Sequence, residues 1–142
     1  MQRPIGFGEF IKKNGFHSVY LITLDSGNPV KVGVAEDPAD RLGNLQTANF
    51  LPLRIHRFWW MPGKQVTLRV ESAFKEHFQP QNIRGEWFDV PLEMAEAFVE
   101  ERIRGLGTWG VRQSDIVGLM DQWARKKYGL PPEAPSPLRG WQ

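Results

Sequence analysis

Four side chains of complementary chemistry occur in order along the chain. Tyr20 carries a phenol, Lys31 an ammonium, Arg41 a guanidinium and Glu71 a carboxylate. Together such groups can orient water, neutralise the charge of a phosphate and hold one divalent metal ion, which suffices for phosphodiester hydrolysis. We therefore ask whether a small α/β domain brings them to one place.

Each of the four also has a simpler structural explanation. The tyrosine lies in an aliphatic run that suits a protein core, and the lysine fits the solvent face of an alternating strand. Arg41 follows Asp37 by four residues, and Glu71 precedes Lys75 by four, which are the spacings of helical ion pairs. Taken one at a time, these residues leave both interpretations open.

A β-hairpin is predicted where the first two of these side chains occur. The runs 19–24 and 30–35 are rich in β-formers, and residues between them favour a turn. Because side chains alternate along strands, Tyr20 shares a face with Lys31 and Gly33 only if the numbers of opposed residues add up to an odd value. A glycine inside a strand also indicates close approach by a ligand or another backbone.

The remaining elements follow from capping signals and periodicity. Asp37 and Pro38 predict the start of a helix that runs to about Gln46 and carries Arg41 in its first turn. Further along, the pattern predicts a strand over 53–60, a helix over 66–77 that carries Glu71, a short strand over 87–90, a helix over 91–105 with Met94, Phe98 and Val99 in its apolar stripe, and a helix capped by Ser114.

These elements predict an α/β (α+β) fold with a small three-stranded antiparallel sheet flanked by helices and followed by a C-terminal helical extension. We divide the chain into a lead-in over 1–16, a domain over 17–104, the extension over 105–130 and a proline-rich tail over 131–142. The basic end of the extension, Arg125, Lys126 and Lys127, suits contacts with DNA.

Composition narrows the chemistry further. The chain of 142 residues is 41% hydrophobic and 24% charged, which is typical of one globular domain. Because it has no cysteine and only three histidines, carboxylates binding a hard cation are the expected metal ligands. No apolar run is long enough for a membrane span and no signal peptide is evident, so we expect a cytoplasmic protein.

The same motifs, taken in order, resemble the GIY-YIG nuclease superfamily over roughly residues 17–90, and most closely its short phage and bacterial branch. The motifs are Val19-Tyr20-Leu21-Ile22, Lys31-Val32-Gly33, Asp37-Pro38-Ala39-Asp40-Arg41-Leu42, Glu71 and Gly85-Glu86-Trp87-Phe88. The resemblance implies an endonuclease that hydrolyses DNA with one cation, Mg²⁺ or Mn²⁺. In it, Tyr20 would help activate water, Arg41 would hold the phosphate and Glu71 would ligate the metal.

Two positions depart from that pattern. His17 and Ser18 stand where a glycine and an isoleucine are usual, and Lys31 replaces the tyrosine of the second motif. A lysine beside Tyr20 can lower the pKa of the phenol or bind phosphate, so Lys31 is retained as a catalytic candidate. Lys31, Gly33 and Arg41 are also expected to contact DNA, and Glu86 is a reserve carboxylate.

Two other functions remain open from the sequence. One is a catalytically inactive module that binds DNA through Lys31, Arg41 and the basic helix. The other is a phage accessory protein that binds a protein partner through Trp59, Trp60 and that helix. The two tryptophans also suit stacking on bases. A compact nuclease of this size is further expected to need a homodimer or a partner protein for specificity.

Overall fold

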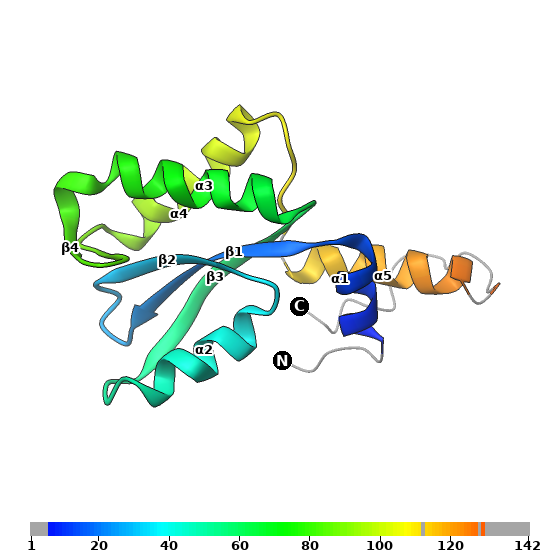
Figure 1. Cartoon of the computed structure of the whole chain (residues 1–142), viewed down its shortest axis with the longest axis horizontal. Helices are drawn as coiled ribbons and strands as arrows, with labels where there is room; N and C mark the ends of the chain where they lie inside the picture. Colours follow the sequence, from blue (N-terminus) through cyan, green and yellow to red (C-terminus); the bar gives the residue numbers. More distant parts are fainter. Residues whose placement is uncertain (1–5, 112, 128, 130–142) are drawn as a thin grey trace.

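The computed structural model describes residues 6–111, 113–127 and 129, which fold around an antiparallel sheet of five strands in the order β3-β1-β2-β5-β4. The helices α3 and α4 cover one face of this sheet, and α2 covers the other (Figure 1). The elements are α1 (Phe7–Asn14), β1 (His17–Leu24), β2 (Val30–Ala35), α2 (Pro38–Thr47), β3 (Leu53–Met61), α3 (Lys64–His77), the 3₁₀ turn η1 (Gln79–Gln81), β4 (Asn82–Arg84), β5 (Trp87–Phe88), α4 (Leu92–Gly105) and α5 (Gln113–Lys127).

The mixed α/β class with flanking helices is confirmed, but the prediction of three strands is wrong. The sheet also includes β5, which lies within the short strand predicted over 87–90, and β4, whose three residues are too few for an alternating pattern to show. They form a hairpin that turns through Gly85, whose φ of 56° suits glycine. The strand predicted over 87–90 is accordingly shorter and ends at Phe88.

The helix that carries Arg41 begins as its capping signal predicts. The Asp37 carboxylate accepts hydrogen bonds from the backbone N–H groups of Ala39 and Asp40, at 3.0 and 3.4 Å, and Pro38 occupies the first helical position. These contacts satisfy donors that the first turn would otherwise leave unpaired. The cap therefore fixes the residue at which α2 begins and places Arg41 in its first turn.

The central hairpin has the register that the site requires. Tyr20 lies opposite Gly33 and Ile22 lies opposite Lys31, so each opposed pair adds up to 53, an odd number. Tyr20, Lys31 and Gly33 consequently share the face that α2 covers. Their neighbours Val19 and Leu21 point to the opposite face.

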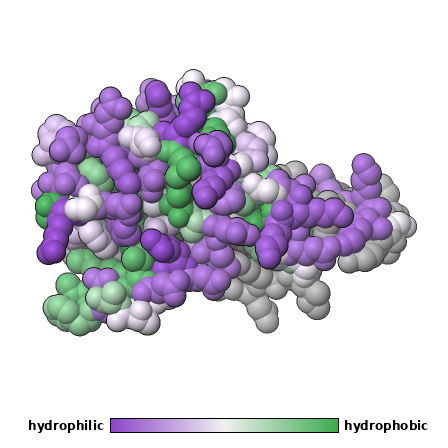
Figure 2. All heavy atoms as spheres, viewed as in Figure 1, coloured by the Kyte–Doolittle hydropathy of each residue, from purple (hydrophilic) through white to green (hydrophobic). Residues whose placement is uncertain are grey.

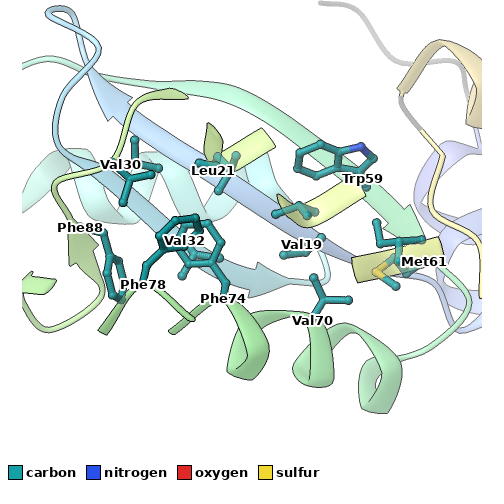
Figure 3. Close-up of a cluster of buried hydrophobic side chains, with 14 residues drawn as sticks. Val19, Leu21, Val30, Val32, Trp59, Met61, Val70, Phe74, Phe78 and Phe88 are labelled. Carbon is teal, nitrogen blue, oxygen red and sulfur yellow. The ribbon is translucent and has the colours of Figure 1, made fainter. Parts of the chain in front are cut away.

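That opposite face forms the main core with α3 and α4. Figure 3 shows its aliphatic and aromatic side chains converging between the sheet and α3. The side chains that α4 buries fully are Ala95, Val99 and Ile103, whereas Met94 is 54% exposed. The predicted stripe of α4 is therefore wrong at Met94, because the helix turns its Ala95 row toward the sheet.

A second core joins α1 and α5 at the end of the sheet. It consists of Phe7, Phe10, Ile11, Trp60, Ile116 and Met120. Trp60 is fully buried there and Trp59 is 1% exposed in the main core, so both are core residues and the alternatives in which they stack on bases or bind a partner are wrong. Ser114 lies inside α5, which begins at Gln113, and the tail over 131–142 lies outside the described residues.

Strand β3 contains a bulge that changes which face its side chains point to. Its pairing with β1 shifts between Leu21, which faces Arg57, and Ile22, which faces Ile55, so His56 is an extra residue. His56 Nε2 and Arg57 Nε each lie 3.0 Å from Glu96 Oε1 on α4. The two consecutive side chains therefore reach the same partner, which strict alternation would prevent.

The close packing of Tyr20 on Gly33 can be tested by adding one methyl group. A Cβ at position 33 would overlap the phenol oxygen of Tyr20, which is buried under α2. We expect Gly33→Ala to lower the free energy of unfolding in urea by about 1–3 kcal/mol, the usual cost of overpacking. The control Gly43→Ala, on α2 with open space around the added carbon, should be neutral or stabilising by up to ~1 kcal/mol. Equal stability of the two variants would contradict the packing.

Candidate functional site

Tyr20 lies at the centre of the candidate site. Its side chain is 1% exposed and lies over Gly33, while Leu42 and Leu45 of α2 pack on the same cluster. Burial raises the pKa of the Tyr20 phenol, and the nearby Arg41 guanidinium partly offsets this rise. The carboxylates of Glu86 and Glu71 raise it further, although their effect is smaller. Tyr20 thus lies within electrostatic reach of groups from α2, α3 and the β4–β5 turn.

Four charged side chains form a continuous network beside Tyr20. Lys31 Nζ of β2 forms an ion pair with Glu86 Oε2 of the β4–β5 turn. Lys75 Nζ of α3 lies 2.9 Å from Glu86 Oε1 and 3.6 Å from Glu71 Oε1. We call Lys31, Glu86, Lys75 and Glu71 the charge network. Its signs alternate along the chain of contacts, so each ammonium meets at least one carboxylate.

The two carboxylates of the charge network differ in their electrostatic balance. Burial would raise the pKa of Glu86, but hydrogen bonds from Lys31 and Lys75 outweigh it and hold that pKa below its ordinary value. Burial raises the pKa of Glu71, and Lys75 compensates only in part while Glu86 adds repulsion. Glu71 is therefore the carboxylate whose negative charge lacks sufficient compensation.

Strand β2 leaves part of its edge open next to this network. It pairs with β5 only at Val30 and Lys31, and the Val32 N–H is 3.4 Å from the Glu86 carbonyl oxygen. Beyond that point, within the part of the chain that the structure describes, Gly33 to Ala35 pairs with β1 alone. The short β5 strand thus makes room at the edge near Gly33.

A pocket of about 560 Å³ lies on the other side of Arg41. It lies between α1 and the start of α2, and Trp60 closes part of its wall. Its charged and amide lining comprises Glu9, Lys12, Glu36, Asp37, Asp40, Arg41 and Asn44. Four of these are carboxylates and two, Lys12 and Arg41, are cations, so the lining is acidic on balance.

The predicted site residues separate into two groups. Arg41 and Glu71 each act electrostatically on the Tyr20 phenol, and Lys31 joins them through Glu86. The basic residues at the end of α5 lie apart, since α5 extends from the end of the sheet opposite β4 (Figure 1). There, Arg125 Nε lies 3.0 Å from Asp121 Oδ2, and Lys127 forms an ion pair with Glu9 of α1.

Sequence reasoning missed how Lys75 and Glu86 connect the site. Lys75 was expected only as a helical partner of Glu71, and that ion pair is present. The contact between Lys31 and Glu86 spans 55 positions of the chain, and no local spacing predicts it. Among the described residues, no three histidine, aspartate or glutamate side chains gather to hold a metal ion. Any ion at this site would depend on Glu71, with Glu86 as its neighbour.

The opposite pKa shifts of the two carboxylates predict opposite effects on stability. A raised carboxyl pKa means that ionised Glu71 disfavours folding, so we expect Glu71→Gln to raise the melting temperature at pH 7. That gain should vanish at ~pH 3, below the ordinary glutamate pKa of about 4.3, where Glu71 is protonated in both states.

Glu86→Gln should lower the melting temperature at pH 7. A lowered carboxyl pKa contributes stability that is present above the unfolded pKa and is lost as the pH falls through the folded one. The difference between this variant and the wild type should therefore shrink in acid. Thermal unfolding at both pH values provides the comparison, and shifts of the same sign for the two variants at pH 7 would contradict the assignment.

Comparison with known proteins assigns the chain to a family. The model of the T5orf172 domain matches residues 17–104. No curated protein and no solved structure matches the chain. No helix among the described residues is long and apolar enough to cross a membrane.

The family match also corrects the earlier resemblance. Assignment to the GIY-YIG nuclease superfamily is wrong, because the matching model is that of a different family and spans the whole segment that carries the motifs. The short motifs alone were too few to distinguish the two. A DNA-binding or nuclease role is compatible with the matching family. Since its model covers more than half of the sequence, the chain belongs to the T5orf172 domain family.

Proposed function

We propose that this domain binds DNA and hydrolyses its phosphodiester bonds at the Tyr20 site. The observation that carries the proposal is a phenol, packed on Gly33, on which one guanidinium and two carboxylates from separate segments of the chain all act electrostatically. A phosphodiester needs cationic groups for its oxygens and a polar group that positions the attacking water. Membership in the T5orf172 domain family is compatible with this role.

Arg41 is the group that holds the phosphate. It is exposed, unlike Lys31, and it projects from the anchored first turn of α2. A guanidinium can donate two parallel hydrogen bonds to phosphate oxygens, which fixes both position and orientation. The neighbouring pocket has four carboxylates against two cations, Lys12 and Arg41, so its interior disfavours a phosphate.

Tyr20 orients the attacking water through its hydroxyl. Because burial raises its pKa above the ordinary value of about 10, the phenol is protonated at neutral pH and is a poor base. A protonated phenol can still donate to the phosphate and accept from water. Gly33 contributes by leaving space for this side chain at the open edge of β2.

Lys31 acts mainly by positioning the network. Its residue is 7% exposed and its ammonium is paired with Glu86, so it supports the site through that carboxylate. Glu86 in turn holds Lys75 beside Glu71. In this arrangement Lys31 supports the site without touching the phosphate itself.

A single hard cation, Mg²⁺ or Mn²⁺, would take Glu71 as its carboxylate ligand in this proposal. The raised pKa of Glu71 reflects a buried carboxylate with insufficient positive charge around it, which a divalent ion would supply. Such an ion, when bound, neutralises the charge that develops on the phosphate oxygens. The protein's own part is to hold the Glu71 carboxylate on α3, at the border of the core, where it is 12% exposed.

Plasmid nicking in the presence of Mg²⁺ tests the proposal. We expect Tyr20→Phe, Arg41→Ala and Glu71→Ala each to lower the nicking rate by at least about 10²-fold, the usual loss for an acid–base or electrostatic group. Arg104→Ala, an exposed position on α4, is the matched control and should leave the rate unchanged. If wild type and Glu71→Ala show the same background, hydrolysis at this site is wrong.

Removal of the cation is a separate test of the same site. We expect excess chelator to abolish nicking and added Mg²⁺ or Mn²⁺ to restore it, because in this proposal the cation bound at Glu71 neutralises the charge on the phosphate. DNA binding measured in chelator should persist, since Arg41 binds phosphate without the metal. Nicking at full rate in chelator would exclude a metal-dependent mechanism.

A non-catalytic DNA-binding module is the second candidate function. It is favoured by charge, because the segment 41–70 contains Arg41, Arg54, Arg57, Lys64 and Arg69 and no carboxylate. Salt-dependent binding without any cleavage would select this alternative. A homodimer or a partner protein that supplies specificity also remains a prediction, which light scattering with and without DNA can test.

A further inference from the structure

The loop between α2 and β3 presents an aromatic side chain almost entirely to solvent. Phe50 is 96% exposed and the adjacent Leu51 is 47% exposed, more than Trp109 at 40%. Figure 2 shows a hydrophobic patch at the lower left, where this loop lies in Figure 1. Leaving a phenyl ring in water is unfavourable, so its presence at a loop tip indicates a contact surface.

This loop is held in one conformation by the side chain of Gln46. Its Nε2 donates to the carbonyl oxygens of Asn49 and Leu51, both at 3.0 Å, and its Oε1 accepts from the Leu53 N–H at 2.7 Å. Asn49 Nδ2 also donates to the Leu45 carbonyl oxygen at 2.8 Å. A rigid loop lets an exposed ring enter a binding partner without a large loss of conformational entropy.

The surroundings of the loop favour a polyanion as the partner. From Arg41 to Phe58 the chain contains no carboxylate, and two of its arginines, Arg41 and Arg54, are exposed, whereas Arg57 is paired with Glu96 of α4. Arg54 of β3 follows the loop, and Arg41 of α2 precedes it. Apolar groups flanked by cations match the stacked bases and the phosphates of DNA.

The geometry also sets how far from the candidate site the loop acts. Six helical rises of ~1.5 Å separate Arg41 from Thr47, and three further residues span at most ~10 Å. Phe50 therefore lies within about 19 Å of Arg41, or about six base steps of ~3.4 Å. One DNA duplex is therefore long enough to span Arg41 and the loop.

We propose that Phe50 and Leu51 form a wedge that inserts between base pairs of duplex DNA within about six base pairs of the phosphate at Arg41. The inference rests on the proposed function for its partner, DNA, but it does not require cleavage. Insertion of such side chains unstacks one base step and kinks the duplex, at a cost of a few kcal/mol per step. A duplex with a gap at that step has already lost this stacking, so the protein does not have to supply the unstacking energy when it binds there.

The experiment uses short duplexes that carry the fluorescent base 2-aminopurine at successive positions. We expect full-length wild type to increase the emission at one or two adjacent positions and to bind a duplex gapped there at least about tenfold more tightly than an intact one. Phe50→Ser should abolish the emission change and remove the preference for the gapped duplex. Ile83→Ser, a 57% exposed apolar residue on β4, is the matched control and should behave as wild type.

Two outcomes would overturn the wedge. One is an emission pattern that Phe50→Ser leaves unchanged, and the other is a wild-type dimer that this variant converts to a monomer, which would assign the loop to a second copy of the chain. The proposed hydrolysis fails separately. If emission rises but plasmid remains intact, the proposed cleavage is wrong and the wedge is supported. If plasmid is nicked without any emission change, the wedge is wrong and the proposed cleavage is supported.

Discussion

The packing of Tyr20 on Gly33 across the central hairpin is the contact on which the candidate site depends. It needs a register in which these two residues oppose one another, and it needs a residue without a side chain at position 33. The helix that covers Tyr20 also carries Arg41, so the same burial that shields the phenol brings a guanidinium beside it. The contact between Tyr20 and Gly33 therefore serves both the packing of the core and the chemistry of the site.

Around this contact the fold assembles groups from three distant segments. The charge network joins β2, α3 and the turn between the two shortest strands, and Glu86 connects the others. The two lysines of the network stabilise the ionised form of Glu86, whereas the ionised form of Glu71 is less well stabilised. A carboxylate that destabilises the ionised fold is retained most readily where it serves binding or catalysis, which is the familiar conflict between stability and function.

Local patterns predicted the elements that have local causes. The hairpin follows from turn residues and β-formers, and α2 follows from the cap at Asp37. The pairing that places Tyr20 and Lys31 on one face could be stated from the sequence only as a condition, and the structure supplies it. The ion pair of Lys31 with Glu86 could not be predicted, because it depends on a two-residue strand that brings a remote turn to β2. Nor did short motifs identify the family correctly, since a few residues can recur in different families.

The bulge at His56 has a consequence for the two adjacent tryptophans of β3. One extra residue exchanges the inner and outer sides of the strand for everything that follows it, and this sends Trp59 to the α3–α4 core and Trp60 to the core with α1 and α5. Deleting a single residue there would exchange two large rings between unlike cavities. The strand can therefore accept substitutions far more readily than a change of length, because a change of length would disturb the packing of both cores at once.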